Sequence, residues 1–316
     1  MKYSHIIDYV YGQPWAILPE KLAVITDLLR FRAEGGTLTE AEIQERVGAV
    51  SRPMGGRSGA VAVIPVFGII SQRMTLMSAM SGGTSTEQLA GAFRQVMADD
   101  TVGAVVLDVH SPGGSVYGID ELTSEIYAAR GRKPIVAVAN SLMASAAYYI
   151  ASAADEIAVT PGGEVGSIGV IAAHEDHSAE LEARGIRVSL ITAGRFKAEA
   201  APFQPLSEEA RAAMQSMVND YYGMFIAAVA RGRGVSTAKV RADFGEGRTV
   251  RAKDAVRLGM ADRVATLEQT ISRLARGGSV GRAAALAERG ELDSPSSDST
   301  AGTLDYRRRR FRMHTH

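Results

Sequence analysis

The stretch VGAVVLDVHSPGG, residues 102–114, decides the fold class of this chain. Its first eight residues form an apolar run, which is typical of a strand that lies buried in a parallel sheet. The run leads into Ser111-Pro112-Gly113-Gly114, and a helical pattern follows over residues 116–129. Two adjacent glycines permit positive φ and the close approach of a ligand, and N–H groups at such a turn can face an oxyanion. A plain tight turn has the same composition, but the phosphate-loop patterns GxxxxGK and GxGxxG are absent.

The same alternation of strand and helix continues on both sides of this stretch. Apolar segments predict further strands at 61–66, 134–139, 156–160, 165–172 and 188–192. Helices are predicted at 85–98, from about Ser145, at 178–183, 207–230 and 237–244, and between a short edge strand at Val250 and Gly259. Such alternation at short intervals indicates an α/β fold with a mostly parallel sheet.

Composition divides the chain into three parts. Residues 1–58 are expected to be an N-terminal helical appendage and linker, with a helix from Pro19, a second near Thr39 and a linker at 51–58. Residues 59–276 hold the predicted catalytic domain. Residues 277–316 are rich in Arg, Ser and Asp and predict a flexible tail, because such a segment has too little apolar surface to form a core.

Charge and residue content exclude several classes of protein. Lys plus Arg equals Asp plus Glu, at 35 each, so nucleic acid is not the expected main partner. The absence of cysteine excludes disulfides and thiolate chemistry, and no His/Asp/Glu cluster has metal-ligand spacing, so neither metal nor cofactor is expected. No signal-peptide pattern opens the chain, and the most apolar run, 61–70, is too short to span a bilayer. We therefore expect a soluble, cytoplasmic protein without a membrane partner.

Ser145 is the first candidate catalytic residue. It follows the predicted strand 134–139 and opens an Ala-rich helix, where the positive helix end favours developing negative charge. Its small neighbours Ala144 and Ala146, together with Gly166-Ser167, suggest shallow pockets that take small side chains. Judged alone, a serine at this position is also a common N-cap.

Lys197 is the second candidate, in the segment Gly194-Arg195-Phe196-Lys197. A lysine acts as a general base only when neutral, which requires burial to lower its pKa from about 10.4 toward about 7–8. Phe196, Pro202 and Phe203 are near enough in sequence to supply apolar surroundings. Judged alone, a lysine is most often a solvated surface residue.

Together these segments resemble the signal-peptide-peptidase-A-like serine peptidases, family S49, from about Val61 to Val264. The matching pieces occur in the family's order: SPGG at 111–114, ASAAYYIASAAD at 144–155, GSIGV at 166–170, AGRFK at 193–197 and LGMAD at 258–262. The resemblance implies a Clp-protease/crotonase-like spiral of β-β-α units with helical extensions. It also implies serine endopeptidase activity through an acyl-enzyme.

The resemblance implies a role for each matching residue. Ser145 would be the nucleophile and Lys197 the general base, acting as a dyad. Oxyanion donors would come from Gly113, Gly114 and Ala146. The substrate would add a strand along the edge formed by Gly166, Ser167, Ile168 and Gly169. Two positions depart from the family, which usually has glycine at 140 and often at 146, where this chain has Asn140 and Ala146.

Two further segments resemble the phage prohead or capsid-assembly branch of the family. They are Gln13 to Pro19 near the N-terminus and Ala173-His174 through Gly185-Ile186. This resemblance implies a protease that cleaves scaffold or capsid proteins inside an assembling prohead in the host cytoplasm. The apolar helix 214–229 and the protruding loops predict self-association into a homo-oligomeric ring.

Three alternatives remain open at this point. The first is a Clp-like triad of Ser145, His174 and either Asp155 or Asp176, because His174 follows Ser145 at about the distance that Clp-type proteases use. The second is a crotonase-like acyl-CoA enzyme, which would use the Gly-Gly turn but neither Ser145 nor Lys197. The third is a catalytically inactive capsid-assembly factor. His110, just before the turn, is expected to be structural.

Overall fold

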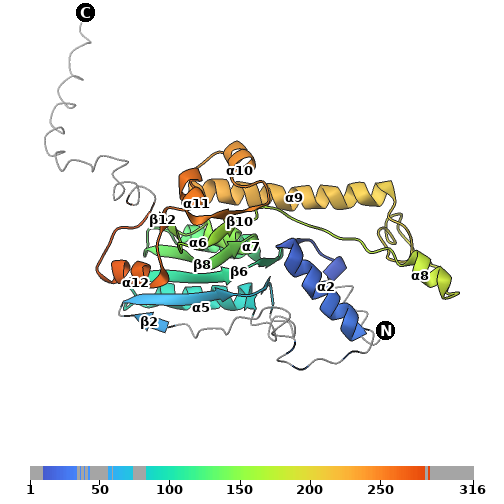
Figure 1. Cartoon of the computed structure of the whole chain (residues 1–316), viewed down its shortest axis with the longest axis horizontal. Coiled ribbons are helices and arrows are strands. Elements are labelled where there is room, and N and C mark those ends of the chain that lie inside the picture. Colours follow the sequence, from blue (N-terminus) through green and yellow to red (C-terminus); the bar gives the residue numbers. More distant parts are fainter. Residues whose placement is uncertain are drawn as a thin grey trace, which may run out of the picture.

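The computed structural model describes residues 10–33, 36, 39, 42, 56–58, 60–73, 83–281 and 284. A large, mostly parallel sheet forms its centre (Figure 1). In spatial order its strands are β11 (Thr249–Arg251), β10 (Glu164–Gly166), β8 (Ile135–Ala144), β6 (Ala104–Ser111), β3 (Val61–Phe67) and β2 (Gly56–Ser58), and β9 (Glu156–Val159), which carries β12 (Arg263–Val264), pairs with the first half of β8.

The central strands are apolar on both faces because helices cover both. Residues 104–109 of β6 are all buried, as the continuous apolar run in the sequence predicts. The helices α5 (Thr86–Ala98), α6 (Ile119–Ala128) and α7 (Ala146–Ala151) pack into the main core on one face. On the other face, Leu274 of α12 (Leu267–Ala275) packs against Val106, Val136 and Val138.

A second, small sheet stands beside the carboxyl ends of these strands. Its spatial order is β1 (Trp15–Ile17), β7 (Gly113–Ser115), β4 (Ile70–Ser71) and β5 (Thr84–Ser85). Each long strand is therefore followed by short strands and a helix: β3, β4, β5 and α5, then β6, β7 and α6. This repeat is the spiral of β-β-α units that the family resemblance implies, and it confirms the predicted α/β fold class.

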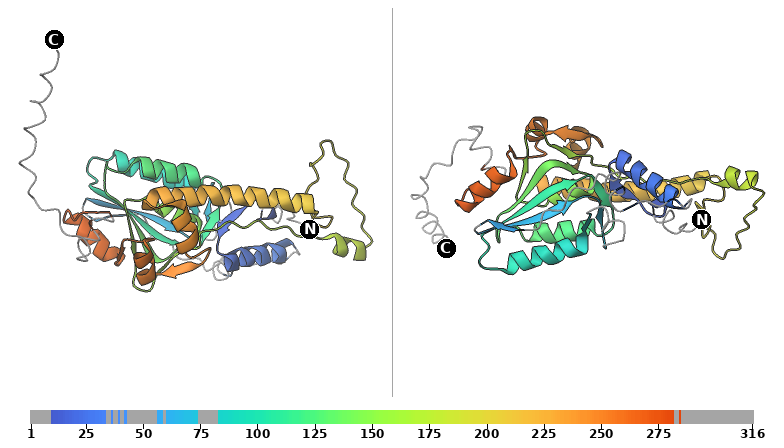
Figure 2. Two further views of the ribbon diagram at one scale, coloured as in Figure 1. Left: turned by 90° about the horizontal axis from the view of Figure 1, so that it is seen from above. Right: turned by 60° about the horizontal axis from the view of Figure 1, so that its bottom comes forward.

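A long arm, residues 172–206, leaves the body between β10 and α9 (Glu208–Arg233). It carries α8 (Ser178–Ala183) and lies beyond the end of α9 that points away from the sheets (Figures 1 and 2). The strand predicted at 188–192 is wrong, since this stretch has no strand partner and Ile191 is fully exposed. An apolar run forms a strand only where another strand can satisfy its backbone, and none lies beside the arm among the described residues.

The remaining helices follow the predicted pattern. They are α2 (Pro19–Ala33), α10 (Thr237–Asp243) and α11 (Ala252–Leu258), whose C-cap is Gly259. Residues 15–17 and 56–58, which composition groups with the appendage, lie in β1 and β2. Most of the predicted helix near Thr39 and the tail after residue 281 lie outside the described residues. No helix in the described part of the chain is long and apolar enough to cross a bilayer.

Candidate active site

Ser145 lies on a sharp turn between β8 and α7. Its φ of 54° and ψ of −120° put a non-glycine residue in a region that costs about 1–3 kcal/mol to occupy. The backbone N–H of Ser145 donates a 2.7 Å hydrogen bond to the carbonyl of Gly166, which holds this conformation. The side chain is buried, and its Oγ has no hydrogen-bond partner among the described residues. A buried, unpaired hydroxyl on a strained turn indicates a functional group, since burial of such a group is otherwise unfavourable.

The two glycines of the SPGG turn lie directly against Ser145. A Cβ placed on Gly113, which has φ of 101°, would come 2.9 Å from Ser145 Cβ and 3.1 Å from the Ala146 nitrogen. A Cβ on Gly114 would come 1.8 Å from the carbonyl oxygen of Ile70, in the neighbouring strand β4. Both glycines are therefore required for this close packing, as the sequence pattern predicts.

The backbone N–H groups around Ser145 differ in their availability. Gly113 donates its N–H to Ser111 Oγ at 3.1 Å, and Ser111 Oγ donates to the carbonyl of Gly68 at 2.7 Å, which fixes the turn. The N–H of Ala146 opens α7 and finds no acceptor among the described residues. Of the three predicted oxyanion donors, Gly114 and Ala146 thus fit the role better than Gly113.

The predicted substrate edge has two unlike halves. Gly166 is already paired on both sides, in parallel with Ala144 of β8 and antiparallel with Thr249 of β11. Ser167, at φ of 52°, turns the chain away and donates its N–H to the carbonyl of Arg248. Residues 168–170 make no backbone hydrogen bond with the described part of the chain. A strand-adding peptide can therefore pair with residues 168–170 and not with Gly166.

Lys197 lies apart from Ser145 in this structure. It is exposed on the arm, where its backbone N–H bonds to the carbonyl of Gly194 at 3.1 Å. Ser145 Oγ has no partner, so the predicted dyad is not assembled within the described residues of one chain. Phe196 and Phe203, expected to bury the lysine, are themselves exposed.

The alternative triad is not assembled either. His174 Nε2 is buried without a hydrogen-bond partner among the described residues, as is Ser145 Oγ. Asp155 accepts from the N–H of Ile135 at 2.9 Å. Asp176 accepts from the N–H of Ser178 at the start of α8, and the hydrogen bonds from Ser178 lower the pKa of that carboxyl. His110 Nδ1 lies 3.1 Å from the Asn140 carbonyl and its ring stacks on Phe67, which agrees with a structural role.

The sequence gave no warning of a buried ion pair behind the site. Asp262, at the end of LGMAD, pairs through both oxygens with Arg233 of α9 at 2.6 and 3.0 Å, and both side chains are almost fully buried. Asp262 also accepts from the N–H of Ile157 in β9. Nearby, Tyr148 of α7 donates to the carbonyl of Met260. An acidic residue within an otherwise apolar segment was the only available signal. The described residues include no cluster that could hold a metal ion.

A serine on a strained strand-to-helix turn, with glycine N–H groups beside it, is the arrangement that serine hydrolases use for a nucleophile. Residues 128–281 match the family model described as peptidase family S49, and the chain belongs to this family of serine peptidases.

The relatives include phage proteins and cellular proteases. The chain is 30% identical to the head-tail preconnector protein GP5 of Enterobacteria phage P21, over 86% of this chain and 57% of that protein. It is 31% identical to capsid assembly protease C of Escherichia phage lambda, over 67% of this chain and 48% of that protein. A putative protease of Methanocaldococcus jannaschii shares 34% over 56% of each chain. The chain therefore spans about half the length of these relatives.

Among solved structures, a mutant of the 1510-N membrane-bound stomatin-specific protease is similar to this chain. It has a TM-score of 0.43 and 16% identity, over 67% of this chain and 83% of that one. The protease ClpP1 of Listeria monocytogenes has a TM-score of 0.41 and 13% identity, over 66% of this chain and 94% of that one.

Proposed function

We propose that the chain is a serine endopeptidase in which Ser145 is the nucleophile and Lys197 the general base. The observation that carries the proposal is the buried, unpaired Ser145 Oγ on its strained turn, beside the Gly113–Gly114 backbone. The hydroxyl oxygen would attack the scissile carbonyl carbon while its proton passes to the neutral Lys197 amine. The resulting oxyanion would accept from the N–H groups of Gly114 and Ala146.

The second half of the reaction would return the proton. The tetrahedral intermediate collapses, the C–N bond breaks, and the leaving amine takes the proton from the Lys197 ammonium. Water then attacks the acyl-enzyme, with Lys197 again accepting a proton, and Ser145 recovers its own when the acid leaves. Each step needs Lys197 Nζ within hydrogen-bond reach of Ser145 Oγ.

Self-association is the route by which we propose that Lys197 reaches a serine. The arm is exposed and carries apolar side chains that face solvent, including Val188, Leu190, Ile191 and Phe196. A second copy that covers the arm would bury these side chains together with Lys197, which is the condition for a neutral lysine. This supports the predicted homo-oligomeric ring.

The proposed substrates are scaffold or capsid proteins of an assembling phage head. Support comes from the names of two relatives, a head-tail preconnector protein and a capsid assembly protease, and from the match of the first over most of this chain. Cleavage of a neighbouring scaffold or capsid protein would be followed by mass spectrometry of the products.

Three substitutions test the dyad, with Lys253→Ala on the exposed face of α11 as the matched control. Ser145→Ala and Lys197→Ala should each lower peptide hydrolysis at least about 1,000-fold, while Lys253→Ala should leave it unchanged. Mixing the two inactive proteins should restore part of the activity if the lysine comes from a neighbouring copy. An active Lys197→Ala with an inactive His174→Ala would instead assign the base to His174.

A further inference from the structure

The three-residue strand β1 lies between the two walls of the candidate site. On one side it runs antiparallel to β7, with Trp15 opposite Ser115, Ala16 opposite Gly114 and Ile17 opposite Gly113. On the other side Trp15 donates its N–H to the carbonyl of Ile171 at 2.7 Å, and Ile171 donates back to Trp15 at 2.8 Å. The chain's own residues thus pair with both the oxyanion strand and the strand edge that leads from residues 168–170.

The carbonyl group of Ala16 lies against the predicted catalytic groups. The point where a Cβ on Gly113 would sit is 2.2 Å from the Ala16 carbonyl oxygen, 2.9 Å from Ser145 Cβ and 3.1 Å from the Ala146 nitrogen. A main-chain carbonyl of an extended peptide is therefore held beside the nucleophile and an N–H donor. This is the placement that acyl transfer requires of a substrate.

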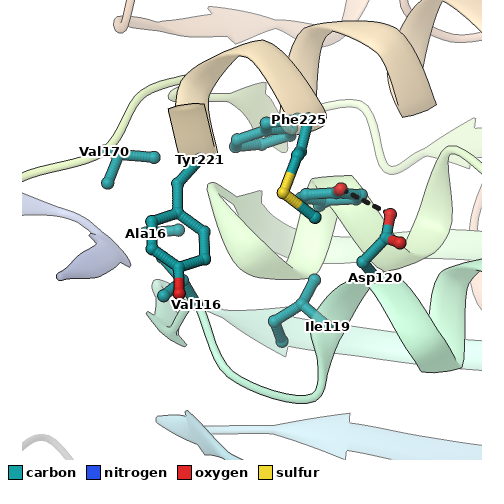
Figure 3. A pocket seen from close by; sticks show the side chains of 9 residues that line it. Ala16, Val116, Ile119, Asp120, Val170, Tyr221 and Phe225 are labelled. Atoms are coloured by element: carbon teal, nitrogen blue, oxygen red, sulfur yellow. Dashed lines mark hydrogen bonds between the residues drawn. The ribbon is translucent and has the colours of Figure 1, made fainter. Parts of the chain in front are cut away.

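The methyl group of Ala16 fills a small apolar pocket (Figure 3). The pocket walls come from β7 and its following turn, α6, α7, the strand edge and α9, and include Val116, Ile119, Tyr149, Val170 and Phe225. The remaining free space is about 10 Å³, which is room for about one water molecule. The carboxylate that lines it, Asp120, accepts a hydrogen bond from the Tyr149 hydroxyl. A small side chain fits here, whereas a large or negatively charged one does not.

We infer that β1 is an internal pseudosubstrate: it occupies the peptide-binding cleft, and a substrate must displace residues 15–17 to reach Ser145. The pocket beneath Ala16 then selects a small apolar side chain in the substrate residue whose carbonyl is attacked. This inference rests on the proposed function, because it takes Ser145 as the nucleophile.

The way β1 is anchored makes displacement feasible. Trp15 and Ile17 point to the side opposite Ala16 and pack with Leu22, Ile25 and Leu29 of α2. The Trp15 ring donates to the carbonyl of Val10 at 2.8 Å. The anchor is thus a satellite cluster, separate from the main core, so its loss does not require the main core to open.

Trp15 is the single tryptophan of the chain and is buried, so its fluorescence reports the position of β1 directly. The first experiment adds the peptide acetyl-Gln-Pro-Phe-Ala-Ile-Leu-amide to the full chain carrying Ser145→Ala, which prevents cleavage. Binding, followed by the anisotropy of a labelled copy of the peptide, should be accompanied by a red shift of Trp15 emission. The same peptide with Glu in place of Ala should neither bind nor shift the emission.

The second experiment weakens the latch in otherwise wild-type protein. Ala16→Glu places a charge in the apolar pocket beside Asp120 and should expel β1, red-shifting Trp15 emission without any peptide. Peptide affinity and hydrolysis should rise about 10-fold, since the competing segment no longer fills the cleft. Ala23→Glu, on the exposed face of α2, is the matched control and should change neither. Leu22→Ala loosens the anchor without adding a charge and should act in the same direction as Ala16→Glu.

The outcomes separate this inference from the proposed function. Peptide binding without a Trp15 shift, or equal peptide affinity in Ala16→Glu, Leu22→Ala and Ala23→Glu, would overturn the pseudosubstrate role. Absence of peptide binding in the expelled variants would overturn it as well. If the peptide displaces β1 but no variant with an intact Ser145 hydrolyses it, the inference stands and the proposed catalytic function fails.

Discussion

The backbone N–H of Ser145 donates a 2.7 Å hydrogen bond to the carbonyl of Gly166. Gly166 is itself held between β8 and β11, so the turn that carries the serine is tied to the sheet at a fixed point. This bond explains how a serine stays at φ of 54° and ψ of −120° against the local backbone preference. The strain at Ser145 is thus balanced by contacts of the surrounding sheet.

Ser145→Gly should make the protein more stable than Ser145→Ala, although both should be inactive. Glycine adopts this φ and ψ without steric cost, whereas alanine retains the strain. We expect a difference of about 1–2 kcal/mol in the free energy of unfolding, measured by urea denaturation. Equal stability of the two variants would show that the turn is unstrained in solution.

Gly114→Ala should disrupt the small sheet. The added Cβ would lie 1.8 Å from the carbonyl oxygen of Ile70, a backbone atom of β4 that cannot move without breaking the strand pairing. We expect destabilisation of at least about 3 kcal/mol and loss of hydrolysis, measured by thermal denaturation and peptide cleavage.

Gly91→Ala is the matched control for this substitution. Gly91 lies in α5, and a Cβ there meets nothing within 4 Å. Because alanine has the higher helix propensity, Gly91→Ala should stabilise the protein by about 0.5–1 kcal/mol. A Gly114→Ala protein as stable as the Gly91→Ala protein would contradict the described packing of β7 on β4.

The sequence predicted the parts of this protein that local pattern determines. The strand 104–111, the SPGG turn, the serine that opens α7 and the helix after Ser207 are all encoded by apolar periodicity, Gly-Gly and helix-opening residues. Those signals are short in range. They place Ser145 beside Gly113 and Gly114 because consecutive parallel strands end at the same edge of the sheet.

Relationships between distant segments were not predictable in the same way. Val188 to Thr192 has the composition of a strand, but strand formation depends on a partner that composition does not reveal. The segment Gln13 to Pro19 matched a family pattern, yet only the register with β7 and Ile171 shows that Ala16 lies at the site. The distance from Lys197 to Ser145 is likewise set by the arm, which packs too little on the core for local pattern to fix its position.

Breaking the Arg233–Asp262 pair should destabilise the protein strongly. Arg233→Met leaves the Asp262 carboxylate buried without its bidentate partner, at an expected cost of about 3–5 kcal/mol in the free energy of unfolding. The double variant Arg233→Met/Asp262→Leu should recover part of that loss, because no unpaired charge remains. Urea denaturation of the three proteins measures the coupling. A double variant as unstable as the sum of its single variants would argue against this pairing.

Asp108 should make the stability of the protein depend on pH. It lies buried in β6 with no hydrogen-bond partner for Oδ1 among the described residues, and burial raises the pKa of its carboxyl. With a raised pKa, the folded state retains a proton that the unfolded state has already lost. Stability should therefore fall as pH rises from the ordinary aspartate value of about 3.9 through the raised pKa. The penalty stays in place at higher pH.

Asp108→Asn removes the charge and keeps the shape, so it should stabilise the protein at pH 8 by about 1 kcal/mol or more. The gain should shrink as the pH approaches 4, where Asp108 is neutral in both proteins. Thermal denaturation at pH 4, 6 and 8 measures the difference in melting temperature between variant and parent. Asp100→Asn, at an exposed position after α5, is the matched control and should follow the parent across the range. A melting-temperature difference for Asp108→Asn that is constant from pH 4 to pH 8 would show that the carboxyl titrates alike in the folded and unfolded states, which the burial of Asp108 contradicts.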